Sequence, residues 1–174
     1  MTSIPNLGNA GSASLKWLFV SGLIVVLDQY TKWLIINNFY EFERILLLPM
    51  LDLVRYHNKG AAFSLFANAG GWQTWFFTSV AVIISIAIVW YQWSLPKRGC
   101  RTLATGLALI LGGAVGNVTD RLVHGHVVDF ILFYYEEWAW PAFNVADSAI
   151  TVGVALVIID SLFFERNREL RSKS

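Results

Sequence analysis

Four long apolar stretches, separated by mixed or polar segments, dominate the pattern along the chain. They cover about residues 17–37, 72–93, 102–121 and 143–164. Each is close to the roughly 20 residues that a helix needs to cross the hydrocarbon core of a bilayer. We therefore expect four transmembrane helices.

The first apolar stretch has a competing interpretation as a signal peptide. Asp28 and Lys32 interrupt it, and no cleavage site of small residues follows it. We therefore predict an uncleaved first span. Residues 1–16 before it are polar and small and contain one basic residue, Lys16, which indicates a disordered tail.

The two connections that follow the first and third stretches differ in pattern. In residues 38–71 charges alternate with apolar side chains, and residues 51–56 show the period of a strand with one buried face. Small residues at 58–62 and 68–71 indicate turns. We expect a small β-element on the membrane surface here. Residues 122–142, rich in Phe, Tyr and Trp, predict a re-entrant or interfacial segment.

Composition supports the membrane interpretation. Of the 174 residues, 56% are hydrophobic and 14% are charged, whereas soluble chains carry roughly 25% charged residues. The length fits one domain, here a single polytopic membrane domain over residues 1–174. A net charge of +1 and the absence of a basic arm argue against a nucleic-acid partner. The single cysteine, Cys100, cannot form an intramolecular disulfide, and we assign it no role.

The distribution of lysine and arginine predicts the orientation. Residues 1–16, residues 94–101 and the last ten residues together hold eight of them, and the other two connections hold three. Short basic loops stay in the cytoplasm. Both termini are therefore expected in the cytoplasm, with residues 38–71 and 122–142 outside.

Small residues recur at every fourth position of the third stretch. They are Ala104, Ala108, Gly112 and Gly116. Such a stripe lets another helix approach closely, so we interpret it as a packing surface.

Charged residues inside the spans need an explanation, because each costs at least ~2.5 kcal/mol on insertion scales. Asp28 and Lys32 are four residues apart and can pair on one helix face. This pair could simply anchor the helix or help to shape a site, and the two roles are compatible. We interpret Asp120 and Asp160 as solvated or paired structural acids.

Polar groups from several segments reach the same depth in this topology. Asn117 and Arg121 end the third span, Asn144 and Asp147 begin the fourth, and Asp129 lies in the outer segment between them. Two carboxylates in a poorly hydrated pocket share a proton. The charged one can then take a proton from water while the neutral one polarises a carbonyl. Asp129 and Asp147 therefore predict an aspartate dyad for amide hydrolysis.

Five motifs in this chain carry a family resemblance. They are D-Q-Y-T-K at 28–32, N-K-G-A-A-F-S at 58–64, G-G-A-V-G-N-V-T-D-R at 112–121, V-V-D-F at 127–130 and F-N-V-A-D at 143–147. With this set, over roughly residues 15–165, the chain resembles bacterial lipoprotein signal peptidase, also called signal peptidase II.

The resemblance implies an all-α integral membrane protein, with four transmembrane helices, a small extracytoplasmic β-cradle and an interfacial segment. It implies an intramembrane aspartyl protease of the bacterial cytoplasmic (inner) membrane. Its substrates would be prolipoproteins, cut before a cysteine that carries diacylglycerol, and globomycin would inhibit it. We expect a monomer in contact with membrane lipid, with no cofactor and no metal.

The resemblance also implies roles for particular residues. Asp129 and Asp147 would be the catalytic pair. The other characteristic positions, which would bind substrate or support the site, are Asp28, Lys32, Asn58, Gly60, Gly113, Asn117, Arg121 and Asn144.

Three other functions remain open from the residues alone. A small proton-coupled transporter would explain the intramembrane acid, although transport sites favour the bilayer midplane. A metal hydrolase could use His124, His126 and Asp129. A non-catalytic scaffold would leave the acids unexplained. The aromatic segment 130–140 could act as a lid over the dyad or as a plain membrane anchor.

Overall fold

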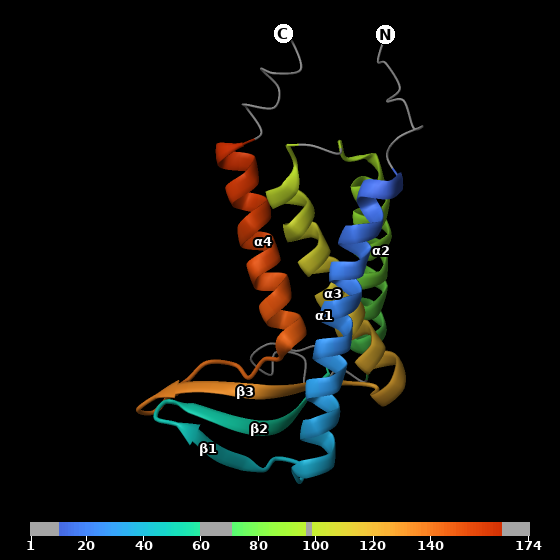
Figure 1. Cartoon of the computed structure of the whole chain (residues 1–174). Coiled ribbons are helices and arrows are strands. Elements are labelled where there is room, and N and C mark those ends of the chain that lie inside the picture. The colour runs from blue at the N-terminus through green and yellow to red at the C-terminus, as the bar shows by residue number, and fades with distance from the viewer. Residues whose placement is uncertain (1–10, 60–70, 97–98, 165–174) are drawn as a thin grey trace.

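Four helices form a bundle, and a small sheet lies across one end of it (Figure 1). The computed structural model describes residues 11–59, 71–96 and 99–164. Its elements are α1 (Gly11–Asn38), β1 (Arg44–Leu48), β2 (Leu51–Asn58), α2 (Trp72–Ser94), α3 (Arg101–His124), β3 (Val127–Tyr135), β4 (Trp138–Ala139) and α4 (Val145–Phe163). Each helix is long and apolar enough to cross a membrane. The predicted fold class is confirmed.

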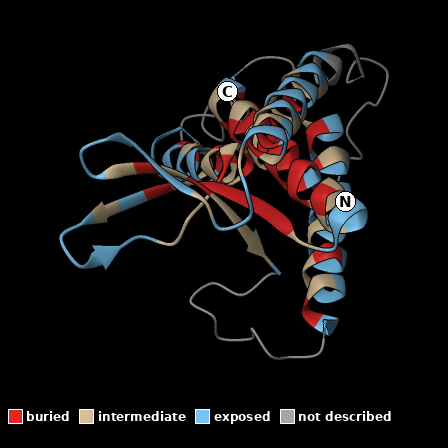
Figure 2. Cartoon of the chain, turned by 90° about the horizontal axis from the view of Figure 1, so that it is seen from below, coloured by how far each residue is buried: buried red, intermediate tan, exposed pale blue. Residues whose placement is uncertain are grey.

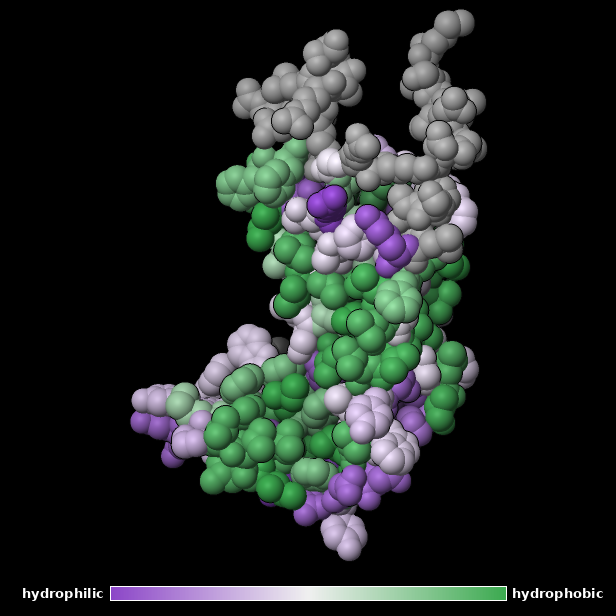
Figure 3. Space-filling view, viewed as in Figure 1, coloured by the Kyte–Doolittle hydropathy of each residue, from purple (hydrophilic) through white to green (hydrophobic). Residues whose placement is uncertain are grey.

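The helix α3 is the centre of the bundle. Of its apolar stretch 56% is buried inside the protein, against 22% or less for α1, α2 and α4. It packs against all three of them, and buried positions line the facing sides of the helices (Figure 2). The face of the bundle seen in Figure 3 carries apolar side chains, and many large apolar residues of the helices are exposed, as expected of a surface in contact with lipid.

The small residues of α3 allow this close packing. A Cβ on Gly112 would lie 2.7 Å from the Ser21 carbonyl oxygen, and one on Gly116 would lie 2.6 Å from Asp28 Oδ2. Both neighbours belong to α1, so the packing role predicted for the stripe is confirmed at these positions. Gly106 and Gly113 lie on a second face of α3 and pack in the same way against α4.

We expect Gly113→Ala to destabilise the fold, because the new Cβ would overlap the Ala146 carbonyl oxygen and lie 2.7 Å from Ile150 Cγ1. Overpacking of this kind costs about 1–3 kcal/mol. Thermal unfolding in detergent measures it. Gly22→Ala is the matched control, since a Cβ there meets nothing within 4 Å and alanine favours a helix. Equal losses in the two variants would contradict the packing argument.

The sheet has the order β1-β2-β3-β4, and each neighbouring pair is antiparallel. The strand predicted at residues 51–56 is confirmed by β2. Its register with β3 places Tyr56 opposite Asp129 and Asn58 opposite Val127. The sheet therefore brings the end of β2 beside the carboxylate of Asp129.

Two segments differ from the sequence expectation. Residues 11–16, assigned to the tail, belong to α1. The expected re-entrant or interfacial segment contains β3, an inner strand of the sheet. Residues 127–130 are all buried, Asp129 included, so this part of the strand is covered on both faces and shows no alternation, and periodicity alone does not distinguish such a segment from other buried segments.

Hydrophobic contacts hold the sheet against the bundle. Ile35 near the end of α1 forms a buried cluster with Val128 and Phe130 of β3, and Val145 of α4 packs against it. Phe143 exchanges backbone hydrogen bonds with Ile131 just before α4 begins. The first turn of α4 is thereby fixed beside β3.

Candidate active site

The N-terminus of α4 positions the first carboxylate. Asn144 is the N-cap residue: its side chain accepts a hydrogen bond from the Asp147 backbone N–H at 2.9 Å, and Asp147 Oδ2 accepts one from the Asn144 N–H at 3.2 Å. Asparagine and an acid three residues later favour this reciprocal cap. The helix dipole further favours a negative charge on Asp147.

The second carboxylate, Asp129, is buried in β3 with 3% of its surface exposed. Its Oδ2 accepts a hydrogen bond from Asn58 Nδ2 at 2.9 Å, and its Oδ1 accepts one from Asn144 Nδ2 at 2.8 Å. Burial, with a further contribution from the charge of Asp147, raises the pKa of Asp129 to about 7. Asp129 can therefore hold a proton near neutral pH.

Asn117 of α3 connects this pair. Its Oδ1 accepts hydrogen bonds from Lys32 Nζ at 3.0 Å and Asn144 Nδ2 at 3.3 Å, while its Nδ2 donates to Asp147 Oδ1 at 2.8 Å. An ammonium group can only donate. Lys32 therefore fixes the direction of the Asn117 amide, and with it the donor that faces Asp147.

Lys32 lies in a buried ionic cluster under the site. Its Nζ is 2.8 Å from Asp28 Oδ2 and 2.9 Å from Asp120 Oδ2, and all three side chains are at most 2% exposed. The predicted pair of Asp28 and Lys32 is confirmed. Asp28 Oδ1 also accepts the Ala146 N–H at 2.9 Å, which ties α1 to the first turn of α4.

Asp120 is part of the site, which the sequence interpretation missed. Its pairing was expected, but its Oδ2 also accepts the Val128 backbone N–H at 3.1 Å, one residue before Asp129. Gln29 Nε2 donates to its other oxygen at 2.8 Å. The spacing of three residues from Asn117 is a sequence signal for this role, because it places both on one helix face. Asp160, by contrast, is buried near the other end of α4 rather than solvated.

Arg121 brings a positive charge to the dyad. Its Nη1 donates to the Asn117 carbonyl at 3.4 Å, and it interacts electrostatically with Asp147 and Asp129. Its Nε is buried and has no hydrogen-bond partner among the described residues. A guanidinium with unused donors at this position can bind the carbonyl oxygens of a peptide.

The structure thus brings most of the predicted site residues together at the sheet end of the bundle. These are Asp28, Lys32, Asn58, Asn117, Arg121, Asp129, Asn144 and Asp147. Gly113 lies at the contact between α3 and α4, against Ala146. Gly60 lies outside the described residues.

The histidines lie in a different arrangement from a metal site. The His126 ring is 3.9 Å from the His57 ring between centroids, and His57 Nδ1 is 2.9 Å from Glu41 Oε1. Both Asp129 oxygens accept hydrogen bonds from asparagines. Within residues 11–59, 71–96 and 99–164, no three His, Cys, Asp or Glu side chains are placed to hold a metal ion. The metal hydrolase interpretation is therefore not supported.

Comparison with known proteins decides the family. Residues 20–163 match the family model described as signal peptidase (SPase) II. The chain belongs to the signal peptidase II family. The motif-based resemblance is confirmed, and the transporter and scaffold interpretations are set aside. As a family member, the protein is an aspartic peptidase of a membrane and removes signal peptides from prolipoproteins.

Individual relatives agree with this assignment. A lipoprotein signal peptidase of Alteromonas mediterranea is 50% identical, over 84% of this chain and 80% of that protein. One of Acinetobacter baumannii is 47% identical, over 91% and 90%. A solved structure described as a bacterial membrane enzyme is 31% identical and has a TM-score of 0.74. The match covers 84% of this chain and 87% of that one. Fold and sequence thus point to the same family.

Proposed function

We propose that this signal peptidase II cuts the peptide bond before a diacylglyceryl-modified cysteine, with Asp129 and Asp147 as its catalytic dyad. The observation that carries the proposal is the unequal environment of the two carboxylates. Asp129 is buried and its pKa is raised to about 7. Asp147 is half-buried in the first turn of α4 and accepts hydrogen bonds from Asn117 Nδ2 and the Asn144 N–H.

This inequality assigns a role to each carboxylate. Ionised Asp147 takes a proton from a water molecule, whose oxygen attacks the scissile carbonyl carbon. Protonated Asp129 donates a hydrogen bond to the carbonyl oxygen and transfers its proton to that oxygen as the carbon becomes tetrahedral. The carbon–nitrogen bond then breaks: the leaving nitrogen receives the proton held by Asp147, and the hydroxyl returns its proton to Asp129. The two carboxylates titrate as a coupled pair throughout.

Neighbouring groups can hold the substrate in this cycle. Arg121 interacts electrostatically with both carboxylates, and its Nε–H has no acceptor among the described residues; we assign it the binding of a backbone carbonyl of the prolipoprotein. Asn58 orients Asp129 through its amide. Inhibitors of the globomycin type would occupy the same position as the substrate backbone.

The position of the dyad fits a substrate that is anchored in the membrane. The site lies at one end of the bundle, where the sheet meets the first turn of α4 (Figure 1). The basic residues of the sequence predict that this end is the outer, periplasmic boundary of the inner membrane, with both termini cytoplasmic. An apolar signal helix would present the bond next to its lipidated cysteine at that depth.

Product mapping tests the proposed cleavage position. Purified protein in detergent is expected to convert a diacylglyceryl-modified prolipoprotein to a product that begins with the lipidated cysteine, identified by mass spectrometry. The unlipidated precursor should be cut more slowly, because lipid binding helps to position the bond. A product that begins elsewhere, or equal rates on both precursors, would exclude this specificity.

The pH profile tests the assigned protonation states. We expect kcat/KM to fall as pH rises through about 7, because Asp129 then loses its proton. Steady-state cleavage in a series of buffers measures this basic limb. A profile that stays flat from about pH 6 to 8 would contradict the role of Asp129.

A substitution of Asn58 tests the same assignment, because it should shift the basic limb of the pH profile in a defined direction. The Asn58 hydrogen bond lowers the pKa of Asp129, so Asn58→Ala should move the basic limb to higher pH.

The raised pKa of Asp129 also affects stability. Between pH 3.8, the ordinary pKa, and about pH 7, the folded protein holds a proton on Asp129 that the unfolded chain has lost. The contribution of Asp129 to stability is therefore lost as pH rises through this range.

A further inference from the structure

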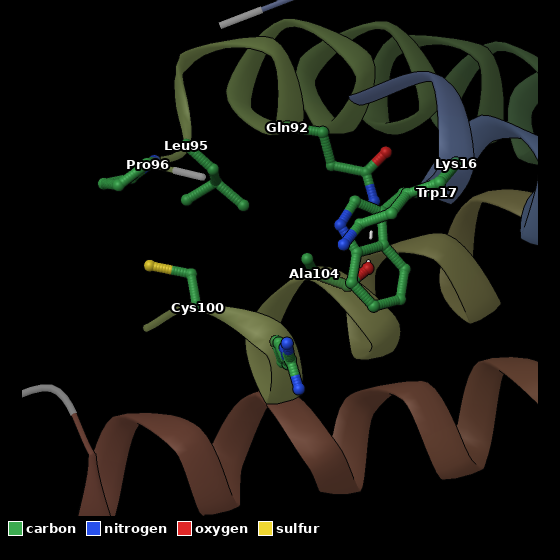
Figure 4. Close-up of a pocket in the computed structure, with 8 residues that line it drawn as sticks. Lys16, Trp17, Gln92, Leu95, Pro96, Cys100 and Ala104 are labelled. Carbon is green, nitrogen blue, oxygen red and sulfur yellow. Dashed lines mark hydrogen bonds between the residues drawn. The ribbon is translucent and has the colours of Figure 1, made fainter. Parts of the chain in front are cut away.

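A hollow lies between three helices at the end of the bundle opposite the dyad (Figure 4). The hollow is shallow and open: its cavity volume is about 10 Å³, and the empty space of about 290 Å³ around it includes open solvent. Its lining residues come from the start of α1, the end of α2 with its following turn, and the start of α3. They are Lys16, Trp17, Gln92, Leu95, Pro96, Cys100, Arg101 and Ala104.

Two positive charges on separate helices line this hollow. Lys16 belongs to α1 and Arg101 to α3, and both side chains are exposed. In the described ranges, neither is within ion-pair distance of an acidic side chain. Two cations beside one hollow, with no acidic partner in the part of the chain that the structure describes, create a local positive potential that attracts an anion.

The rest of the hollow is built by fixed and partly apolar groups. Gln92 is 3% exposed, and its Nε2 donates to the Ala104 carbonyl at 3.1 Å, which joins α2 to α3 at this point. Lys16 Nζ lies 4.8 Å from the centroid of the Trp17 ring. Figure 4 shows these two side chains together beside Gln92. An indole next to cations is typical of the level of lipid headgroups.

We propose that this hollow binds the phosphate headgroup of an anionic phospholipid. Basic pockets between transmembrane helices on the cytoplasmic side bind such headgroups. Lys16 and Arg101 contact the phosphate from opposite helices, and Trp17 and Leu95 face the first carbons of the lipid. The acyl chains extend along the apolar outer surface of the helices (Figure 3). A bound lipid would thus join α1 to α3 far from the dyad.

The test measures lipid binding without substrate, so its outcome does not depend on the proposed cleavage mechanism. Purified full-length protein in a neutral detergent is titrated with dioleoyl phosphatidylglycerol or dioleoyl phosphatidylcholine, and bound lipid is counted by native mass spectrometry. We expect preferential binding of phosphatidylglycerol. Lys16→Gln and Arg101→Gln should each weaken the affinity for phosphatidylglycerol about fivefold, because one basic side chain near an anionic lipid contributes about that factor to binding.

Matched controls separate a site from diffuse charge. Lys59→Gln removes one exposed cation near the dyad end and should leave phosphatidylglycerol binding unchanged. Inorganic phosphate, added at the same concentration as the lipid, should also leave it unchanged. Thermal unfolding without lipid checks that each variant folds. If only one of Lys16→Gln and Arg101→Gln folds, that variant alone tests the site. The proposal would be overturned if the two lipids bound equally or if Lys59→Gln weakened phosphatidylglycerol binding as much as Lys16→Gln or Arg101→Gln. It would also be overturned if inorganic phosphate displaced phosphatidylglycerol as strongly as added phosphatidylglycerol does.

Discussion

Asp129→Asn and Asp147→Asn are each expected to lower kcat/KM for lipidated prolipoprotein by at least about 10³-fold, within the range for loss of a positioned acid or base. Asparagine has nearly the same shape as aspartate but one acceptor oxygen in place of two, so one hydrogen bond at each position can persist, for example from Asn144 Nδ2 at position 129 and from Asn117 Nδ2 at position 147. What is lost is the ability to take up and release a proton. Single-turnover cleavage by purified variants measures the loss.

A comparison with a remote carboxylate makes this result specific. Asp52→Asn changes a buried acid of the same sheet that pairs with Arg44 rather than with the dyad, and we expect its cleavage rate to stay within a few-fold of the native rate. Unfolding midpoints of all three variants exclude a folding defect as the cause. Near-native cleavage by either dyad variant would remove that residue from the catalytic role.

The second large effect is expected on stability. Lys32→Met should destabilise the protein by about 3–5 kcal/mol, because it removes the only ammonium group that contacts both Asp28 and Asp120 in the described structure. Two carboxylates would then be buried without their counter-ion. The free energy of unfolding, measured by denaturant titration in mixed micelles, reports the loss.

A compensated variant separates buried charge from lost packing. Replacing Asp28 and Asp120 by asparagine together with Lys32→Met removes all three charges, and it should restore much of the stability while leaving the Asn117 amide without its ammonium partner. We therefore expect a folded protein with reduced cleavage. A loss below about 1 kcal/mol in Lys32→Met alone would show that the cluster contributes little.

The membrane-spanning architecture could be predicted from the sequence because lipid imposes a simple rule: a span must be long, apolar and helical. The alternation at residues 51–56 likewise identified β2. The strand β3 could not be recognised, since its first four residues are all buried and give no alternation. The pairing of β2 with β3 brings the side chains of Asn58 and Asp129, 71 positions apart in the chain, within hydrogen-bond distance, and no local pattern records that register.

The site could be predicted as a set of residues but not as a network. Spacing placed Asp28 near Lys32, and the motifs indicated the dyad. The orientation of the Asn117 amide depends on contacts from α1, α3 and α4 at once. The link from Asp120 to the backbone before Asp129 also needs the folded arrangement, because it joins the end of α3 to the start of β3.

The capped first turn of α4 has a consequence for biosynthesis. Synthesis runs from the N-terminus, and α4 is the last of the four helices in the chain. Until it inserts, Asp129 lacks its hydrogen bond from Asn144, and Asp28 lacks the Ala146 N–H that it accepts. A nascent chain with three inserted helices therefore carries no complete dyad. With Asp129 and Asp147 as the proposed catalytic pair, we expect no proteolysis by a nascent chain until its last helix enters the membrane.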